Sequence, residues 1–318
     1  MKIAYLFPGQ GAQSVGMGKR IYQQYSEARN IYEQASHILG KDMIKLCFES
    51  TEEELAKTEN TQIAIAVTSL AMLAVLEKKN IQPQIVAGLS LGEYVALMSA
   101  GILTPEQGFT LLQKRGYCMA HYVPNEPFAM AAIIGIPSEK IEEVCKHIQA
   151  QEKFVTTANY NYSDQTVISG NEKAVEQAME VLKEKGRVVK LKTGGAFHTS
   201  KLEQARQVFQ THLQNATFDA EKFENSPIKI IKNIDGTPYT VQDNIAQILS
   251  HHIVSPLRFD KTIEYMLAQG IDTFVEVGPG KTLIGFVKKE LVKRGKDMTP
   301  YQFFDSTNFE NIKEENHG

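Results

Sequence analysis

Residues 85–97 read Ile-Val-Ala-Gly-Leu-Ser-Leu-Gly-Glu-Tyr-Val-Ala-Leu, and they predict a strand, a sharp turn and a helix in succession. The apolar run 85–87 is typical of a buried strand, and residues 93–97 have the composition of a helix. Between them, residues 88–92 form a G-x-S-x-G motif in the strand–turn–helix context in which this motif presents a nucleophilic serine. The stretch therefore predicts an α/β fold with Ser90 exposed at the end of a strand.

The two glycines of this motif have a steric role in the prediction. A turn that pushes one side chain outward leaves no room for Cβ atoms two residues to either side. The helix that follows directs its free N–H groups and the positive end of its dipole toward the serine oxygen. Ser90 is therefore the candidate nucleophile, and the N–H of Leu91 is placed to stabilise the oxyanion that forms when Ser90 attacks a carbonyl. An ordinary βα turn without a catalytic role is the alternative.

The composition excludes several classes of protein. A chain of 318 residues with 42% hydrophobic residues can form one large domain or two. A net charge of −3 gives no signal for nucleic-acid binding, and three widely spaced cysteines indicate neither a disulfide framework nor a zinc site. The N-terminus lacks the features of a signal peptide, and the apolar segment 63–76 is too short to span a bilayer. We therefore expect a cytoplasmic protein without a membrane segment.

Two glycine-rich segments look like nucleotide-binding loops but lack a required glycine. A dinucleotide loop at 8–13 would need glycine where Ser14 stands, and a phosphate loop at 278–282 would need glycine where Val275 stands. The first loop can still bring backbone N–H groups to a site, and Gln10 is then a candidate second oxyanion donor. A purely structural turn is the alternative for this loop.

The rest of the chain alternates between predicted helices and strands. Elements between residues 128 and 192 occur in the order β-α-β-β-α-β, which is the ferredoxin-like order. We expect a small subdomain at 127–193 and a large α/β subdomain built from residues 1–126 and 194–318. The polar residues 308–318 are expected to fray. Outside the small subdomain, the remaining predicted elements are a strand at 2–7, helical patterns at 18–39, 51–56, 62–79, 105–121, 200–215, 242–252 and 256–269, and strands at 228–233 and 273–277.

A serine nucleophile requires a general base, and His198 is the candidate among the eight histidines. It lies in a predicted loop directly after glycines, where the chain returns from the small subdomain. Six of the other histidines fall in predicted helices and show no spacing typical of metal ligands, so we predict no metal site. Because no Asp stands in an obvious third position, a backbone carbonyl is a candidate to orient the base.

Six motifs of the chain together resemble those of malonyl-CoA:acyl-carrier-protein transacylases, and the resemblance runs nearly from end to end. The order and spacing of these motifs would be hard to reproduce in an unrelated hydrolase with the same serine motif. The resemblance implies an α/β-hydrolase-like core that carries an inserted ferredoxin-like subdomain. The motifs are Phe-Pro-Gly-Gln-Gly-Ala-Gln at 7–13, Gly-Leu-Ser-Leu-Gly-Glu-Tyr at 88–94, Lys-Arg-Gly at 114–116, Ala-Asn-Tyr-Asn at 158–161, Gly-Ala-Phe-His at 195–198 and Glu-Val-Gly-Pro-Gly-Lys at 276–281.

The resemblance also implies a role for each candidate residue. Ser90 would be the acylated nucleophile and His198 its general base. The N–H groups of Leu91 and Gln10 would form the oxyanion hole. Arg115, which by position alone is typical of a surface residue on a helix, would pair with the free carboxylate of the malonyl group, because a planar two-pronged donor suits a carboxylate.

Two positions depart from the family pattern. Leu89 stands before the serine, where family members often carry His, and this position is not the base. His252 stands nearest the position where the family usually has Gln, whose backbone carbonyl is thought to orient the catalytic histidine. Since every residue has a backbone carbonyl whatever its side chain, we expect the backbone carbonyl of His252 to take this role. The run at 196–198 and Leu91 are similar to the malonyl-type version of the family.

The implied reaction is transfer of a malonyl group from malonyl-CoA to the phosphopantetheine thiol of acyl carrier protein. It would proceed by a ping-pong route through a malonyl-serine intermediate, would supply fatty acid synthesis, and would need no metal or redox cofactor. The expected partners are acyl carrier protein and coenzyme A thioesters, and we expect a monomer. Three alternatives stay open: a discrete acyltransferase of a polyketide synthase, a serine thioesterase or other hydrolase, and a carrier-binding protein without activity.

Overall fold

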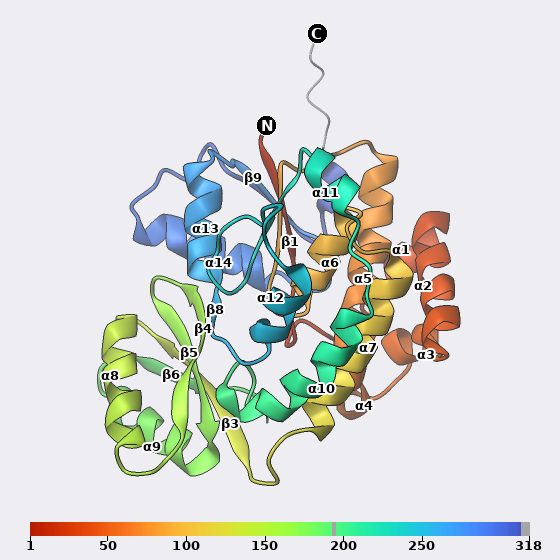
Figure 1. The fold of residues 1–318 in the computed structure, drawn as a ribbon. Coiled ribbons are helices and arrows are strands. Elements are labelled where there is room, and N and C mark those ends of the chain that lie inside the picture. The colour runs from red at the N-terminus through yellow and green to blue at the C-terminus, as the bar shows by residue number, and fades with distance from the viewer. Residues whose placement is uncertain (193–194, 313–318) are drawn as a thin grey trace.

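The computed structural model describes residues 1–192 and 195–312 and contains two β-sheets with helices packed on them (Figure 1). The larger sheet has the strand order β10-β9-β1-β2-β7, and each neighbouring pair is parallel. This arrangement confirms the predicted α/β class. Its strands are Ile3–Phe7 (β1), Ile85–Gly88 (β2), Lys229–Ile231 (β7), Thr273–Glu276 (β9) and Gln302–Phe304 (β10).

Helices from both ends of the chain surround the larger sheet (Figure 1). Helix α7 begins at Pro105, as predicted, and the Thr104 side chain caps it by accepting the backbone N–H of Gln107. The helices are Lys19–Gln24 (α1), Ser26–Leu39 (α2), Met43–Phe48 (α3), Glu52–Ala56 (α4), Thr58–Lys78 (α5), Gly92–Ser99 (α6), Pro105–His121 (α7), Glu203–Gln214 (α10), Ala220–Asn225 (α11), Ile245–His252 (α12), Phe259–Ala268 (α13) and Thr282–Lys293 (α14), with short 3₁₀ helices at Ser200–Leu202 (η1) and Phe309–Asn311 (η2).

Strand β1 divides its side chains between two hydrophobic cores. Tyr5 and Phe7 join the core that contains α2, α5 and α7, and Leu6 joins the core that contains α13 and α14. Burial on both faces is the usual condition of a parallel sheet. At its carboxyl end β1 lies beside β2, because Phe7 pairs with Gly88, so the loops that follow these two strands meet.

Helix α5 lies at the centre of the first core. Almost every residue from Asn60 to Leu76 is buried, as predicted for the apolar stretch of this helix. By length and composition α5 could cross a bilayer, but 89% of that stretch is buried inside the fold. Among the described residues it is the only helix with such a length and composition, and its burial is that of a core helix.

The second sheet has the strand order β6-β3-β5-β4-β8 and packs against two helices of its own (Figure 1). The element order β3-α8-β4-β5-α9-β6 is the predicted one, and these four strands pair antiparallel. The predicted subdomain boundary at 126/127 lies just before β3, and the boundary at 193/194 lies outside the described residues. The elements are Phe128–Ile134 (β3), Ser138–Gln149 (α8), Val155–Tyr162 (β4), Gln165–Asn171 (β5), Glu172–Leu182 (α9), Arg187–Lys190 (β6) and Leu257–Arg258 (β8).

Strand β8 corrects the prediction of a helix over 256–269. Leu257 and Arg258 pair in parallel with β4, and α13 begins only at Phe259. The Arg258 guanidinium lies 4.6 Å from the centre of the Tyr160 ring in β4, and the backbone N–H of Arg258 donates to the Asn233 carbonyl at 2.7 Å. These tertiary contacts override the local helical pattern, and they join the second sheet to the C-terminal part of the chain.

Two further expectations need correction. The helical pattern 18–39 is broken at Tyr25, which is extended and separates α1 from α2. Its hydroxyl donates to Glu310 at 3.1 Å, so a tertiary contact holds the break. The expected fraying over 308–318 is wrong for residues 308–312, because Phe309 and Ile312 are buried. Residues 313–318 lie outside the described part of the chain.

Candidate active site

Ser90 occupies the turn between β2 and α6 with φ of +57°, a left-handed conformation that is strained for a residue other than glycine. The flanking glycines leave space for this turn. A Cβ at Gly88 would lie 2.0 Å from the carbonyl carbon of Gly92, and a Cβ at Gly92 would lie 2.1 Å from the carbonyl oxygen of Phe7. The predicted requirement for glycine at both positions is therefore confirmed.

His198 faces Ser90 from a distant part of the chain. Its Nε2 lies 3.0 Å from Ser90 Oγ, and its Nδ1 lies 3.0 Å from the backbone carbonyl of His252 at the end of α12. Because a carbonyl only accepts hydrogen bonds, Nδ1 carries the proton and Nε2 is the acceptor for the Ser90 hydroxyl. The structure thus brings together three of the predicted site residues, although they are separated by 108 and 54 positions along the chain.

The His198 imidazole is in the form that a general base requires. Only 4% of the residue is exposed. Burial, followed by the positive charge of Arg115, lowers the pKa of His198 to about 3, and the hydrogen bond to the His252 carbonyl opposes this shift. The ring is therefore neutral near pH 7 and can take a proton from the serine.

Arg115 lies on the buried face of α7, with no part of it exposed (0%). Its guanidinium donates to Gln62 Oε1 at 2.8 Å and to Ser90 Oγ at 3.1 Å, and it lies 5.6 Å from the centre of the Tyr94 ring. The position contradicts what a lone arginine on a helix predicts and agrees with the position that the family resemblance implies. Gln62 was not predicted, although a glutamine at the start of the apolar stretch of α5 was a possible signal.

The Arg115 guanidinium has no ion pair with a described residue, and its Nε has no hydrogen-bond partner among them. Burial lowers its pKa, and the nearby Tyr94 and Glu93 oppose this shift. An isolated buried charge costs several kcal/mol unless an opposite charge compensates it. A cation in this position therefore favours a ligand that carries an anion next to Ser90.

The segments that carry the two predicted oxyanion donors pack against each other. Leu91 is buried at the N-terminus of α6, where backbone N–H groups lack partners within the helix. The loop after β1 lies so close that a Cβ at Gly9 would be 2.6 Å from the Leu89 carbonyl oxygen. Gln10 follows in this loop, and its side chain contacts Thr58 Oγ1 at 3.5 Å. The oxyanion roles of Leu91 and Gln10 stay predictions.

Asn233 is a site residue that the sequence analysis missed. Its Oδ1 accepts the N–H of Ser90 at 2.8 Å, and its Nδ2 donates to the Gly88 carbonyl at 2.7 Å, so one amide holds both sides of the turn. Asn233 follows β7, the neighbour of β2 in the sheet. A polar residue at the carboxyl end of a strand beside the nucleophile strand was the available signal.

Metal ligands do not gather in the described part of the chain. No group of three or more His, Cys, Asp or Glu side chains there could hold a metal ion. His251 is exposed and His252 is buried, so these adjacent histidines point to different environments. The site within residues 1–192 and 195–312 therefore consists of a hydroxyl, a neutral imidazole and a buried guanidinium, which suits nucleophilic attack on a carbonyl compound that carries an acid.

The chain is similar to known proteins over nearly its whole length. The family model for the acyl transferase domain matches residues 4–305. The malonyl CoA-acyl carrier protein transacylase of Bacillus subtilis (strain 168) is 38% identical over 290 residues, which cover 91% of this chain and 90% of the relative.

Two solved structures have the same fold over almost the whole chain. The malonyl CoA-acyl carrier protein transacylase of Clostridium perfringens is 37% identical with a TM-score of 0.87, covering 96% of this chain and 93% of the other. A malonyl-transacylase in complex with its type II polyketide synthase acyl-carrier protein is 30% identical with a TM-score of 0.87, covering 96% of this chain and 95% of the other.

Proposed function

Because the chain belongs to the malonyl-CoA:acyl-carrier-protein transacylases, a family of acyltransferases, we propose that it transfers a malonyl group from malonyl-CoA to the phosphopantetheine thiol of acyl carrier protein. The observation that carries this proposal is the buried Arg115 guanidinium, 3.1 Å from Ser90 Oγ and without an ion pair to a described residue. In a malonyl thioester, a single methylene separates the carboxylate from the carbonyl. A carbonyl at Ser90 therefore leaves the carboxylate within reach of Arg115.

The first half of the reaction acylates Ser90. The substrate carboxylate pairs with Arg115, and the thioester carbonyl enters the space beside the N–H groups of Leu91 and Gln10. His198 takes the Ser90 proton at Nε2 as Oγ attacks the carbonyl carbon. The tetrahedral oxyanion is stabilised by the two N–H groups and collapses, the C–S bond breaks, and coenzyme A leaves as a thiol with the proton from His198.

The second half reverses these steps with another thiol, which makes the kinetics ping-pong. The phosphopantetheine thiol of the carrier gives its proton to His198 and attacks the malonyl-serine carbonyl. Ser90 leaves with that proton, and malonyl carrier protein is the product. Between the two halves the ester must avoid hydrolysis, so the site has to restrict water. Arg115 holds the acyl group in line for both attacks and disfavours acyl groups without an acid.

We place this activity in fatty acid synthesis in the cytoplasm, carried out by a monomer that needs no metal or redox cofactor. No step above requires either kind of cofactor. For the fold, we propose the finer description of an α/β-hydrolase-like core with a ferredoxin-like insert at 127–193. The β-α-β-β-α-β order and the antiparallel strand order β6-β3-β5-β4 support the insert.

A transfer assay with a panel of acyl-CoA donors tests the function. We expect malonyl-CoA to give malonyl carrier protein, with acetyl-CoA a poor donor because its acyl group has no carboxylate for Arg115. Rapid release of free malonate in the absence of carrier would instead identify a thioesterase. Equal transfer from malonyl-CoA and acetyl-CoA would contradict the proposed role of the guanidinium.

A second candidate is the loading of a polyketide synthase carrier by the same chemistry. The solved malonyl-transacylase complex with a type II polyketide synthase carrier protein favours this candidate, because its fold matches over 96% of this chain. Competition between a fatty acid carrier and a polyketide carrier for the malonyl-enzyme separates the two pathways. Preferred transfer to the fatty acid carrier is the result that we expect.

A further inference from the structure

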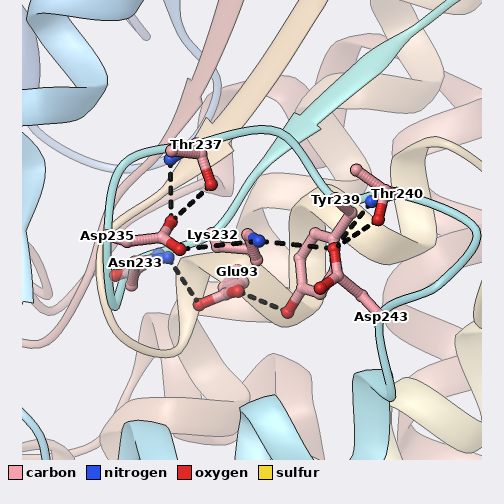
Figure 2. A network of polar contacts seen from close by, with 8 residues as sticks. All are labelled: Glu93, Lys232, Asn233, Asp235, Thr237, Tyr239, Thr240 and Asp243. Carbon is pink, nitrogen blue, oxygen red and sulfur yellow. Dashed lines mark hydrogen bonds and ion pairs between the residues drawn. The ribbon is translucent and has the colours of Figure 1, made fainter.

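A carboxylate is buried three residues after Ser90, and the mechanism above does not use it. Glu93 lies in the first turn of α6 and is fully buried (0% exposed). Its Oε1 accepts a hydrogen bond from the Tyr239 hydroxyl at 2.6 Å, and its Oε2 accepts one from the backbone N–H of Asn233 at 3.3 Å. Figure 2 shows both partners on the loop after β7, which arches over the start of α6. The same Oε2 lies 3.3 Å from Nδ1 of His252.

The contacts of Glu93 lead to Ser90 along two arms. Along the first, Asn233 accepts the Ser90 N–H at 2.8 Å. Along the second, the His252 carbonyl lies 3.0 Å from Nδ1 of His198, whose Nε2 lies 3.0 Å from Ser90 Oγ. The His198 and His252 rings also stack, with centres 5.4 Å apart. The contacts therefore form a closed circuit of five residues. It runs from the Ser90 hydroxyl to His198, His252, Glu93 and Asn233, and from Asn233 back to the Ser90 N–H.

The loop that carries Asn233 and Tyr239 is itself held in place by charged groups. Lys232, only 8% exposed, forms ion pairs with Asp235 at 3.5 Å and Asp243 at 3.3 Å (Figure 2). The loop is thus a fixed support for the two donors that reach Glu93. A buried ionised carboxylate destabilises the fold unless hydrogen bonds or nearby charges compensate the loss of its hydration. The presence of Glu93 beside the proposed nucleophile therefore indicates a role other than packing.

We propose that Glu93 is a positioning residue for the Ser90–His198 pair, holding Asn233 on one side and His252 on the other so that the separation of Ser90 Oγ from His198 Nε2 is fixed. This inference rests on the proposed function, which gives Ser90 and His198 their chemical roles. Glu93 touches neither the substrate nor the reacting atoms in this scheme. Its effect passes through the neighbours that orient those atoms.

The circuit requires the ionised form of Glu93. Two donors converge on the carboxylate, a hydroxyl at Oε1 and a backbone N–H at Oε2, and the ionised group accepts at both oxygens without a proton of its own in the way. Burial raises the pKa of Glu93 to about 7, against the lowering effect of its hydrogen bonds and of Arg115. The positioning form is therefore lost as the pH falls through this value. The charged and titratable groups that face Glu93 are Tyr94, Arg115, Asp235, Tyr239 and His252.

The test measures how fast a fluorophosphonate probe labels Ser90 between about pH 5 and pH 9, in the wild-type chain and its variants. This probe reacts with an activated serine and needs no malonyl carboxylate. Acylation by malonyl-CoA is measured in parallel. If the probe results follow the expectations below but malonyl-CoA gives no acyl-enzyme, the proposed function fails and the positioning role stands.

For the wild type we expect the labelling rate to fall as the pH drops through about 7, the pKa of Glu93. Glu93→Gln should label roughly 10-fold more slowly and lose this pH dependence, since the amide does not titrate and turns an NH₂ group toward one of the two donors. Tyr239→Phe keeps the carboxylate but removes a hydrogen bond that lowers its pKa, so the midpoint should move to higher pH.

Glu276→Gln is the matched control. Glu276 is also fully buried (0% exposed) with its pKa raised to about 7, but it caps α14 through the N–H of Ile284 at 2.9 Å. It should keep the wild-type labelling rate and midpoint. The proposal is overturned if Glu93→Gln keeps the wild-type rate and pH dependence, or if Glu276→Gln removes that dependence. If Glu93→Gln does not fold, an unshifted midpoint in Tyr239→Phe overturns it.

Discussion

Two strand–turn–helix units lie in the larger sheet, and they use similar glycine-rich turns in opposite ways. In the unit β2–α6, Ser90 is pushed out of the turn, and His198 and Arg115 meet its hydroxyl. In the unit β9–α14, the turn at 278–281 bears no such side chain, and the chain's own Glu276 accepts the N–H of Ile284. The first turn thus presents a candidate nucleophile, whereas at the second turn a carboxylate of the chain itself accepts a backbone N–H of the helix. A glycine-rich turn before a helix therefore indicates a functional site only where no side chain of the protein itself binds the N-terminus of that helix.

The largest effect on activity is expected when the serine of the first unit is replaced and the matched residue of the second unit serves as the control. Ser90→Ala removes the proposed nucleophile, and malonyl transfer should fall by roughly 10⁴-fold or more, because His198 then has no hydroxyl to activate. Steady-state transfer to carrier protein measures the loss. The matched change in the other unit, Thr282→Ala at the start of α14, should leave transfer within about two-fold. Comparable losses in both variants would contradict the assignment of chemistry to the first unit.

The next largest effect is expected for Arg115, whose positive charge lies beside Ser90 in the first unit. Arg115→Ala should lower kcat/KM for malonyl-CoA by about 10²–10³-fold, since removal of one partner of a buried charge pair costs about 2–5 kcal/mol. The ratio of acetyl-CoA to malonyl-CoA activity should rise, because acetyl-CoA never used the guanidinium. Arg187→Ala, an exposed arginine of β6, is the control for loss of a positive charge. Equal losses with both donors would remove the carboxylate role.

A smaller effect is expected at His252, the position for which the family resemblance implies Gln. His252→Gln keeps the carbonyl that orients His198 and offers Glu93 an amide N–H, so labelling of Ser90 should stay within about three-fold of the wild type. His252→Ala keeps the carbonyl but leaves Glu93 without that neighbour, and a loss of about 10-fold is expected. If both variants lose activity equally, the side chain of His252 matters in a way that this circuit does not describe.

The smallest effect on activity is expected in the second unit, where the change should appear in stability instead. Burial raises the folded-state pKa of Glu276 to about 7, above its value in an unfolded chain. A raised acid pKa favours the folded state at low pH, and this contribution is lost as the pH rises from about 4.5 through 7. Urea unfolding of Glu276→Gln should therefore show a weaker decline of stability over this interval, by up to ~3 kcal/mol. An unchanged decline would show that Glu276 is not the responsible group.

The sequence predicted those features that depend on local pattern. The steric demand for glycine at 88 and 92, the buried helix α5 and the β-α-β-β-α-β order all follow from short-range rules, and the structure contains each of them. Ser90 and His198 were candidates from their turns alone. The prediction of a helix from 256 failed because β8 forms through pairing with a distant strand. Local propensity carries no information on such a partner.

The supporting residues of the site could not be derived in this way. Asn233 meets Ser90 and Glu93 only because β7 lies beside β2 in the sheet. Arg115 by itself resembles a surface residue, and only the family resemblance placed it in the site. Its burial and its contact with Ser90 are properties of how α7 packs on α5, which no local pattern encodes.

Peptide mapping after incubation with malonyl-CoA tests the central claim most directly. We predict one malonyl group on the peptide that contains Ser90, and its disappearance when phosphopantetheinylated carrier protein is added, with malonyl carrier protein formed in equal amount. A protein that carries no malonyl group on this peptide, while transfer to the carrier still proceeds, would contradict the account.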